Sequence, residues 1–390
     1  MDIGLTRFMR DQVDHVSTGF HRYLYSRIDW GRHMLGIVGP RGVGKTTMFL
    51  QYIKEHEKEM KMLYVSADSI YFADHSLLNL ADEFSREGGE YLFIDEIHKY
   101  QGWSSEIKQI YDGYQDLKVA YTGSSILDIV QGGADLSRRA PVYHLYGLSF
   151  REYLALFEHI QTDTYSLDDI LQLKVTLPEL RHPLPYFKEY LKRGYYPIGN
   201  DHEFSLLLSQ IINTTLEVDI PQYANMSAAT VKKMKRLMAT IARSVPFKPV
   251  MDQLSGELGV SRNILPDYFL YMEKAGLISQ VRDSTGGFRG LGKVEKVYLD
   301  NANMAYVLGR GDSNIGNIRE TFFYSAMRVN EDVIVSRISD FQIEGKTFEV
   351  GGHKKGKRQI EEAKEGYVVK DDIEYGADNI IPLWHFGLNY

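Results

Sequence analysis

The sequence contains no cysteine among its 390 residues. This absence excludes disulfide bonds, thiolate nucleophiles and zinc sites with cysteine ligands. No apolar run approaches the roughly 20 residues that a membrane-spanning helix needs. The residues from Met1 to Arg7 also lack the apolar core of a signal peptide. We therefore expect a cytoplasmic protein that has no membrane partner.

Positive charge is in deficit, with 45 Lys and Arg against 52 Asp and Glu and a net charge of −7. No overall basic field therefore draws the chain to nucleic acid, although a local basic patch remains compatible with this balance. The 12 histidines lack the paired spacing of a metal site. The length suggests two to four domains of roughly 150 residues each.

Residues 39–46 read Gly-Pro-Arg-Gly-Val-Gly-Lys-Thr, which matches the phosphate-binding loop G-x-x-x-x-G-K-[ST] at every specified position. An apolar stretch precedes the loop and a helix-compatible stretch follows it, as the motif requires. A glycine turn followed by a chance Lys-Thr pair is the alternative. The lysine can reach the β- and γ-phosphates of ATP, and the first threonine can ligate Mg²⁺. The predicted nucleotide-binding residues are Gly39, Pro40, Arg41, Gly42, Val43, Gly44, Lys45, Thr46 and Thr47.

Five short apolar segments alternate with helix-like stretches in the first 157 residues. This alternation predicts an α/β fold with a parallel sheet and helices on both of its faces. The segments are residues 34–38, 62–66, 91–95, 117–122 and 142–146.

Two carboxylates, Asp95 and Glu96, follow directly after the third apolar segment. Side chains at the carboxyl end of a parallel strand lie where such sheets bind ligands. We expect Asp95 to hold Mg²⁺, through a water molecule, and Glu96 to act as the base that orients the attacking water. A strand that ends in two solvated acids is the alternative.

Polar and basic side chains after the fourth segment offer further candidates. Thr122 or Ser124 could sense the γ-phosphate through a hydrogen bond, while a helix cap explains the serine equally well. Arg138 or Arg139 could stabilise charge in the transition state, in its own subunit or in a neighbour. A solvated basic turn is the alternative for each arginine.

Taken together, these motifs resemble the bacterial and archaeal AAA-type ATPases that carry a C-terminal domain of unknown function. The resemblance is sharp to about residue 160. It implies that the chain uses ATP and Mg²⁺, that Glu96 is the hydrolytic residue and that a helical lid follows. The segments that carry it are residues 39–47, 93–98, 103, 121–125, 134–139 and 148–154.

The pattern between residues 226 and 300 resembles a winged helix, with a helix at 231–243, a glycine-containing turn, a second amphipathic helix and an alternating hairpin around Gly286 and Gly287. Twelve basic and seven acidic side chains give this stretch an excess of five positive charges. Duplex DNA is therefore a possible partner, although winged helices also bind proteins. Pro266 near the start of the second helix disfavours simple groove reading. The predicted DNA contacts are Lys232, Lys233, Arg262 and Arg289.

The C-terminal pattern consists of a helix at 321–329 and strands at 340–343 and 346–350. This order resembles the PD-(D/E)xK nuclease fold, in which Asp340 and Glu349 would hold a metal ion. The lysine expected two positions after Glu349 is absent, so Lys354 or Lys355 would have to take its place. We therefore expect a degenerate domain that binds without cutting.

These patterns predict four domains: an AAA-like ATPase domain at 1–158, a helical lid at 159–224, a winged helix at 225–312 and a PD-(D/E)xK-like α+β domain at 313–390. The predicted function is an ATP-hydrolysing switch or motor coupled to a DNA or protein partner, with Lys45 among its catalytic residues. The alternatives are a nucleic-acid-binding regulator with a slow ATP switch and an ATP-gated nuclease. The pattern leaves the oligomeric state open.

Overall fold

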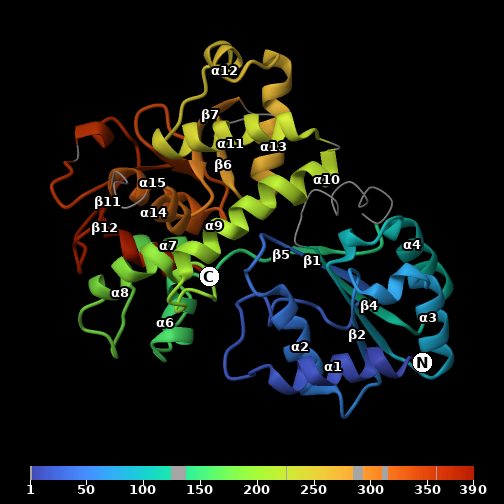
Figure 1. The fold of residues 1–390 in the computed structure, drawn as a ribbon. Helices are drawn as coiled ribbons and strands as arrows, with labels where there is room; N and C mark the ends of the chain where they lie inside the picture. The colour runs from blue at the N-terminus through green and yellow to red at the C-terminus, as the bar shows by residue number, and fades with distance from the viewer. Residues whose placement is uncertain (1, 124–137, 225, 284–292, 310–314, 357) are drawn as a thin grey trace. The chain divides into compact units, whose positions relative to one another are not determined.

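The computed structural model divides into two compact units, Met1–Tyr146 and Gly147–Tyr390, and Figure 1 shows the elements of each. The finer division into four domains remains a prediction. The structure describes residues 2–123, 138–224, 226–283, 293–309, 315–356 and 358–390.

The unit Met1–Tyr146 is built on a five-stranded sheet in the order β2-β3-β4-β1-β5. Every pair of neighbouring strands is parallel, which confirms the parallel sheet expected from the alternating apolar segments. The carboxyl ends of β1, β3 and β4 therefore meet at one edge. The strands are β1 (Met34–Val38), β2 (Met62–Ser66), β3 (Tyr91–Asp95), β4 (Lys118–Gly123) and β5 (Val142–His144).

Helices cover both faces of this sheet (Figure 1). The helices α1 (Ile3–His15) and α2 (Lys45–His56) lie on one face, and α3 (Leu77–Arg86) and α4 (Trp103–Gly113) on the other. The sequence pattern did not predict α1, whose buried side chains Leu5, Met9 and Val13 follow a spacing of four. This helix packs on α2 and on the edge strand β2. Short 3₁₀ turns, η1 (Ile70–Ala73) and η2 (Ile97–Lys99), follow β2 and β3.

The unit Gly147–Tyr390 begins with helices, and that those between residues 159 and 224 form a lid remains a prediction. A capping box at Ser149 and Glu152 starts the first of them, since each side chain accepts the other residue's backbone N–H. The elements are α6 (Phe150–Phe157), α7 (Leu167–Leu171), α8 (Leu184–Glu189), the π-helical turn η3 (Tyr190–Gly194), α9 (Phe204–Thr214), the π-helical turn η4 (Thr215–Asp219) and α10 (Ile220–Ala224).

Three helices and an antiparallel two-stranded sheet follow. Pro266 lies in the first turn of α13, where its missing N–H costs nothing, so it marks the start of that helix. That the group is a winged helix remains a prediction. Its elements are α11 (Ala228–Arg243), α12 (Met251–Leu258), η5 (Arg262–Ile264), α13 (Leu265–Lys274), β6 (Ile278–Arg282) and β7 (Val294–Leu299).

The last part contains two helices and a mixed five-stranded sheet in the order β12-β11-β10-β9-β8. The strand β9 is antiparallel to both of its neighbours, and β10, β11 and β12 run parallel. The elements are α14 (Ala302–Leu308), α15 (Ile315–Met327), β8 (Ile334–Val335), β9 (Phe341–Ile343), β10 (Lys346–Gly351), η7 (Arg358–Ile360), β11 (Gly366–Lys370), β12 (Ile380–Pro382) and η8 (Leu383–Leu388).

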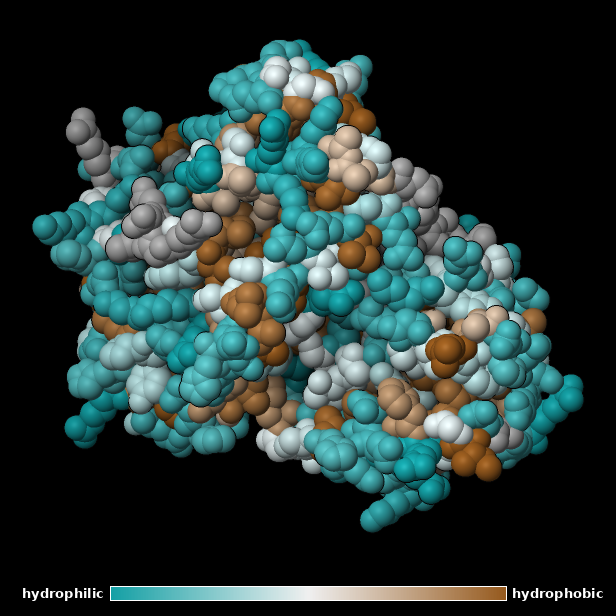
Figure 2. All heavy atoms as spheres, in the orientation of Figure 1, coloured by the Kyte–Doolittle hydropathy of each residue, from teal (hydrophilic) through white to brown (hydrophobic). Residues whose placement is uncertain are grey.

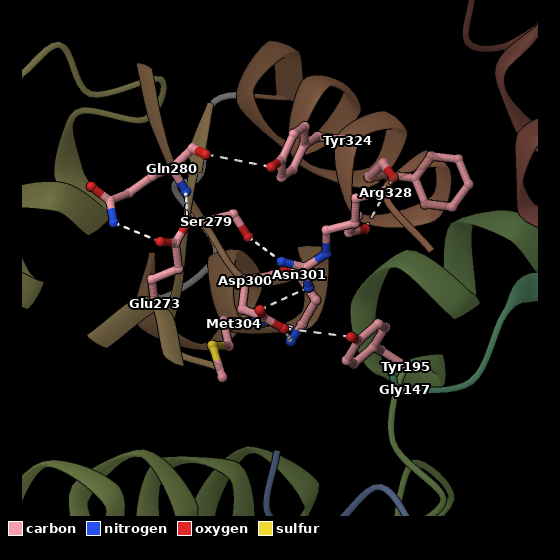
Figure 3. A network of polar contacts seen from close by, with 12 residues as sticks. Gly147, Tyr195, Glu273, Ser279, Gln280, Asp300, Asn301, Met304, Tyr324 and Arg328 are labelled. Atoms are coloured by element: carbon pink, nitrogen blue, oxygen red, sulfur yellow. Dashed lines mark hydrogen bonds and ion pairs between the residues drawn. The ribbon is translucent and has the colours of Figure 1, made fainter. Parts of the chain in front are cut away.

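A buried polar network connects these parts within the second unit (Figure 3). Arg328, which follows α15, forms a 2.7 Å ion pair with Asp300, which follows β7, and also donates to Ser279 of β6. The Tyr195 hydroxyl, beside η3, donates to the other Asp300 oxygen at 3.4 Å. Breaking such a buried charge pair is strongly unfavourable, so the hairpin is fixed to the end of α15.

The visible face of the molecule is mostly hydrophilic, with apolar side chains in small separate areas (Figure 2). In the described part of the chain, no helix combines the length and hydrophobicity that a bilayer crossing requires.

Candidate nucleotide-binding site

The glycine-rich loop between β1 and α2 has a backbone that requires its glycines. Gly42 and Gly44 have φ angles of 83° and 99°, a region that residues with a Cβ rarely adopt. At Gly39 a Cβ would come within 2.1 Å of the Leu145 carbonyl oxygen. The loop can therefore fold closely enough to turn its N–H groups toward an anion at the start of α2.

Lys45, the first residue of α2, holds its amine across this loop. Its side chain is buried, with 5% of the residue exposed, and Nζ donates to the carbonyl oxygens of Gly39 and Pro40 at 2.9 Å each. An ammonium group held at this loop could bind the phosphates of a nucleotide.

Arg22 stabilises the loop through hydrogen bonds, although no sequence motif indicated this contact. Its guanidinium donates to the carbonyl oxygen of Val43, inside the loop, and to that of Tyr146 at 2.7 Å. The segment that carries Arg22 is held in turn by Gln51 of α2, whose amide donates to the carbonyls of Ser17 and Phe20 at 2.8 and 2.7 Å. Because Arg22 is buried, its removal would leave the loop carbonyl without a donor.

Asp95, at the carboxyl end of β3, is the centre of a buried cluster of hydroxyl groups. Thr46 Oγ1 and the Tyr64 hydroxyl donate to Asp95 Oδ2 at 2.7 and 2.9 Å. Thr122 Oγ1 donates to Asp95 Oδ1. The cluster thus joins α2 and the strands β2, β3 and β4, with only 4% of Asp95 exposed. Of these contacts, Tyr64 is the one that sequence reasoning missed.

Burial raises the pKa of Asp95, and the charge of Glu96 raises it further. The three hydroxyl donors act in the opposite direction, because they stabilise the carboxylate. Burial and the charge of Asp95 also raise the pKa of Tyr64 far above its usual range, so this tyrosine stays a neutral donor. A divalent cation at Asp95 would therefore compete with a proton for the same oxygens.

Glu96 follows in a left-handed backbone conformation, with a φ of 53°. A non-glycine residue in this region is strained, and such strain clusters at functional sites. Its N–H donates to Thr122 Oγ1 at 3.1 Å, and Glu96 Oε2 lies 3.5 Å from Nε2 of the buried His98. With 23% of its side chain exposed, the Glu96 carboxylate is accessible to a water molecule.

The donor set at this edge suits Mg²⁺, which prefers hard oxygen ligands and keeps several waters and phosphate oxygens in its shell. Thr46 and Asp95 each present an oxygen, and these oxygens lie 2.7 Å apart. Among the described residues, no group of three or more His, Asp or Glu side chains could hold a metal ion. A nucleotide-bound Mg²⁺ does not require such a protein cage.

The remaining predicted residues of this unit have different surroundings. Arg139 forms an ion pair with Asp112 of α4 at 3.1 Å and lies over the Tyr111 ring. Arg138 and Thr47 are exposed. Ser124 lies outside the described residues.

The predicted DNA-contacting residues of the second unit are partly engaged in internal contacts. Lys233 donates to the Gly259 carbonyl at 2.7 Å, and Arg262 pairs with Asp252 at 3.0 Å. Lys232 is exposed on α11. Arg289 lies outside the described residues.

The acids of the predicted nuclease-like region lie beside lysine side chains. Lys296 Nζ of β7 lies 3.3 Å from Asp340 and 3.8 Å from Glu320 of α15, and Lys355 pairs with the buried Glu349. The structure thus brings one of the two candidate lysines onto Glu349. That the region is a degenerate nuclease-like domain remains a prediction.

Comparison with known proteins finds two family models that match parts of this chain. Residues 31–154 match the family model of an AAA domain, and residues 184–314 match a domain of unknown function (DUF8612). Together with the phosphate loop and the sheet order, the first match supports an AAA-type P-loop ATPase domain in the first unit. The second match leaves the winged helix and the nuclease-like fold as predictions.

Individual relatives are distant. An uncharacterized protein of Methanocaldococcus jannaschii is 25% identical over 271 residues, which cover 64% of this chain and 57% of that protein. The chain is also similar to a Walker-type ATPase of Pyrococcus abyssi (13% identity, TM-score 0.43, 76% of this chain and 99% of that one). A third similar structure is AMPPCP-bound DnaA from Aquifex aeolicus (11% identity, TM-score 0.27, 70% of this chain and 89% of that one).

Proposed function

We propose that the AAA-type domain binds ATP with Mg²⁺ and hydrolyses it, as a switch or motor coupled to a partner. The single observation that carries this proposal is the convergence of Thr46, Asp95, Thr122 and Glu96 at the edge of the sheet where the phosphate loop begins. A loop that only bound an anion would not require an acid exposed to water beside it.

Each residue then has a separate role. The loop N–H groups and Lys45 bind the phosphates, while Thr46 and Asp95 hold the cation. Mg²⁺, when bound with the nucleotide, supplies positive charge that stabilises the phosphoryl group in the transition state. Glu96 accepts a proton from the attacking water, and His98 holds its carboxylate in place. Thr122 couples Asp95 to the backbone of Glu96.

The test is steady-state ATP turnover of the full chain, with wild type compared with Lys45→Ala and Glu96→Gln. The first variant should lose ATP binding, and the second should bind ATP but lose at least about 100-fold in turnover. Glu57→Gln, which changes an exposed glutamate after α2, serves as a control that keeps full activity. Wild-type turnover that persists in Glu96→Gln would show that another group activates the water.

Duplex DNA is one candidate for this partner, and the surface of α11 favours it. Lys232, Arg236 and Arg243 are exposed, and at 100° per residue they fall within an arc of about 40° on this helix. The structure records no ion pair for these three side chains among the described residues. The exposed residues of α13, by contrast, are Pro266, Asp267 and Leu270, which include no cation.

We therefore propose that any contact with DNA is made along the phosphate backbone by α11, without groove reading by α13. Fluorescence anisotropy with a labelled duplex tests this idea over a range of salt concentrations. Replacing all three α11 cations by glutamine should reduce the slope of log K against log salt by up to about 2.7, because each phosphate that is no longer neutralised contributes roughly 0.9. Replacing Arg262 by glutamine is the matched control, since its charge is already paired.

A further inference from the structure

The hydrogen bond between Arg22 and the Val43 carbonyl acts on one particular peptide group of the phosphate loop. That group also contains the N–H of Gly44. A peptide group is planar and trans, so its C=O and its N–H point in opposite directions. Because the Arg22 guanidinium fixes the direction of the Val43 carbonyl, it also fixes the direction of the Gly44 N–H, which points away from Arg22.

The Gly44 N–H is placed where an anion can accept it. Gly44 is the N-cap of α2, and its φ of 99° belongs to the glycine turn of the loop. The structure records no acceptor for this N–H among the described residues. An N–H at the start of a helix that has no protein acceptor is suited to donate to a phosphate oxygen.

The segment that joins α1 to β1 (Figure 1) holds Arg22 in place from two sides. Gln51 of α2 anchors it through the carbonyls of Ser17 and Phe20. On the side of β5, Arg22 donates to the Tyr146 carbonyl at 2.7 Å, and the neighbouring Tyr23 hydroxyl donates to a carbonyl of β5 at 3.0 Å. Only 6% of Arg22 is exposed. A donor fixed in this way orients its acceptor without a further ordering cost when a ligand binds.

We propose that Arg22 is a positioning residue for phosphate binding, which directs the Gly44 N–H at a phosphate oxygen of the nucleotide by holding the Val43 carbonyl. This inference rests on the proposed binding of ATP and does not concern its hydrolysis. Arg22 acts through the loop backbone, and no covalent step is involved.

The test follows the amide signal of Gly44 by NMR while ADP is titrated into the full chain. Valine labelled with ¹³C at its carbonyl and glycine labelled with ¹⁵N select the glycines that follow a valine, which in this sequence are Gly39, Gly44 and Gly351. Val43→Ile removes the Gly44 signal and so assigns it. In wild type the Gly44 amide proton should move downfield, because its N–H donates to a charged oxygen.

Two substitutions of Arg22 separate its donor from the length of its side chain. Arg22→Met removes the donor and should weaken ADP binding, measured by calorimetry, at least about tenfold. The downfield shift of Gly44 at saturating ADP should also become much smaller. Arg22→Lys keeps a donor that can reach the Val43 carbonyl and should restore most of both effects. Arg32→Gln removes an exposed cation of the same segment, paired with Asp29, and should behave as wild type.

An effect of the Arg22 charge alone gives a different result. Arg22→Met would then bind ADP more weakly, but its Gly44 proton would still reach the wild-type position at saturation, which overturns the proposal. If Arg22→Met does not fold, Gln51→Leu takes its place, because it releases the segment that carries Arg22. That variant should bind ADP severalfold more weakly with a smaller Gly44 shift, and wild-type values for both would overturn the proposal.

The wild-type titration separates this inference from the proposed function. ADP binding without movement of the Gly44 signal refutes the role of Arg22 and leaves nucleotide binding intact. A wild type that binds no ADP overturns both.

Discussion

Replacing Thr122 by valine tests the contacts that hold the candidate site together, because valine keeps the shape of the side chain and removes its hydroxyl. That hydroxyl donates to Asp95 and accepts the N–H of Glu96 at 3.1 Å, in a position with no exposure to solvent. The substitution therefore removes one hydrogen bond from the Asp95 carboxylate and one from the Glu96 N–H. Water cannot replace the lost hydroxyl, because the position is buried.

The magnitude follows from the removal of these two hydrogen bonds. A hydrogen bond to a charged group contributes about 1.5–3 kcal/mol, and an unsatisfied buried N–H costs about 1–3 kcal/mol. The unit that contains the site should therefore lose roughly 2.5–6 kcal/mol of unfolding free energy. Because the Thr122 hydrogen bond lowers the pKa of Asp95, its removal raises that pKa further above the ordinary value. Only the ionised form of Asp95 binds a cation, so the acid limb of ATP turnover moves to higher pH.

The assays are urea unfolding and the pH profile of ATP turnover for wild type, Thr122→Val and Thr122→Ser. Serine keeps the hydroxyl and should stay within about 1 kcal/mol of wild type, with its pH profile unchanged. The reasoning is refuted if the valine variant unfolds within about 0.5 kcal/mol of wild type and shows no shift in its pH profile.

Three more substitutions test other parts of the structure. Gly44→Ala introduces a Cβ at a φ of 99°, which should cost about 1–3 kcal/mol and weaken calorimetric ATP binding at least about tenfold; Gly113→Ala, where a Cβ meets open space, is the control. Burial lowers the pKa of His385 from 6.5 to about 3, so below pH 6.5 the unfolded chain binds a proton that the folded chain excludes. Wild type should therefore lose about 2 kcal/mol between pH 7.5 and 5 that His385→Leu retains, and equal pH dependence in urea unfolding would contradict this. Burial and then the charge of Asp340 raise the pKa of Glu320, so the folded state disfavours the ionised form. Glu320→Gln should raise the thermal midpoint at pH 8, and this gain should fade as the pH falls toward about 4.3, where the unfolded chain also carries a neutral acid.

The sequence predicts the centre of the candidate site because local rules apply there. Positive φ angles at Gly42 and Gly44 restrict those positions to glycine, so the loop leaves a readable pattern. Asp95 is recognisable for a similar reason, since four apolar residues before it indicate a buried strand whose end must lie at the edge of the sheet. The parallel topology then brings Thr122 to the same edge.

The residues that support the site, Arg22, Tyr64 and His98, follow no local sequence rule. Arg22 reaches the loop from a segment without regular structure, and any long donor of suitable length in that segment would serve. Tyr64 lies in the middle of an apolar strand, where a tyrosine is also an ordinary core residue. His98 follows Glu96 by two positions, and that spacing alone does not separate a buried contact from a solvated side chain. These contacts depend on tertiary structure, which a single sequence does not specify.

The charge count between residues 226 and 300 also cannot show which cations are exposed. It counts every cation equally, whereas the structure divides them into paired and exposed groups. Arg262 is paired with Asp252, Arg282 with Glu273 and Lys293 with Glu295, so these residues add little to the external field. The charge that remains on α11 is concentrated on one face. Because this face lies on α11 and not on α13, we propose that DNA is bound along its phosphate backbone and that its bases are not read. A partner recognised in this way would be bound with little dependence on its sequence, which suits a motor or switch better than a site-specific regulator.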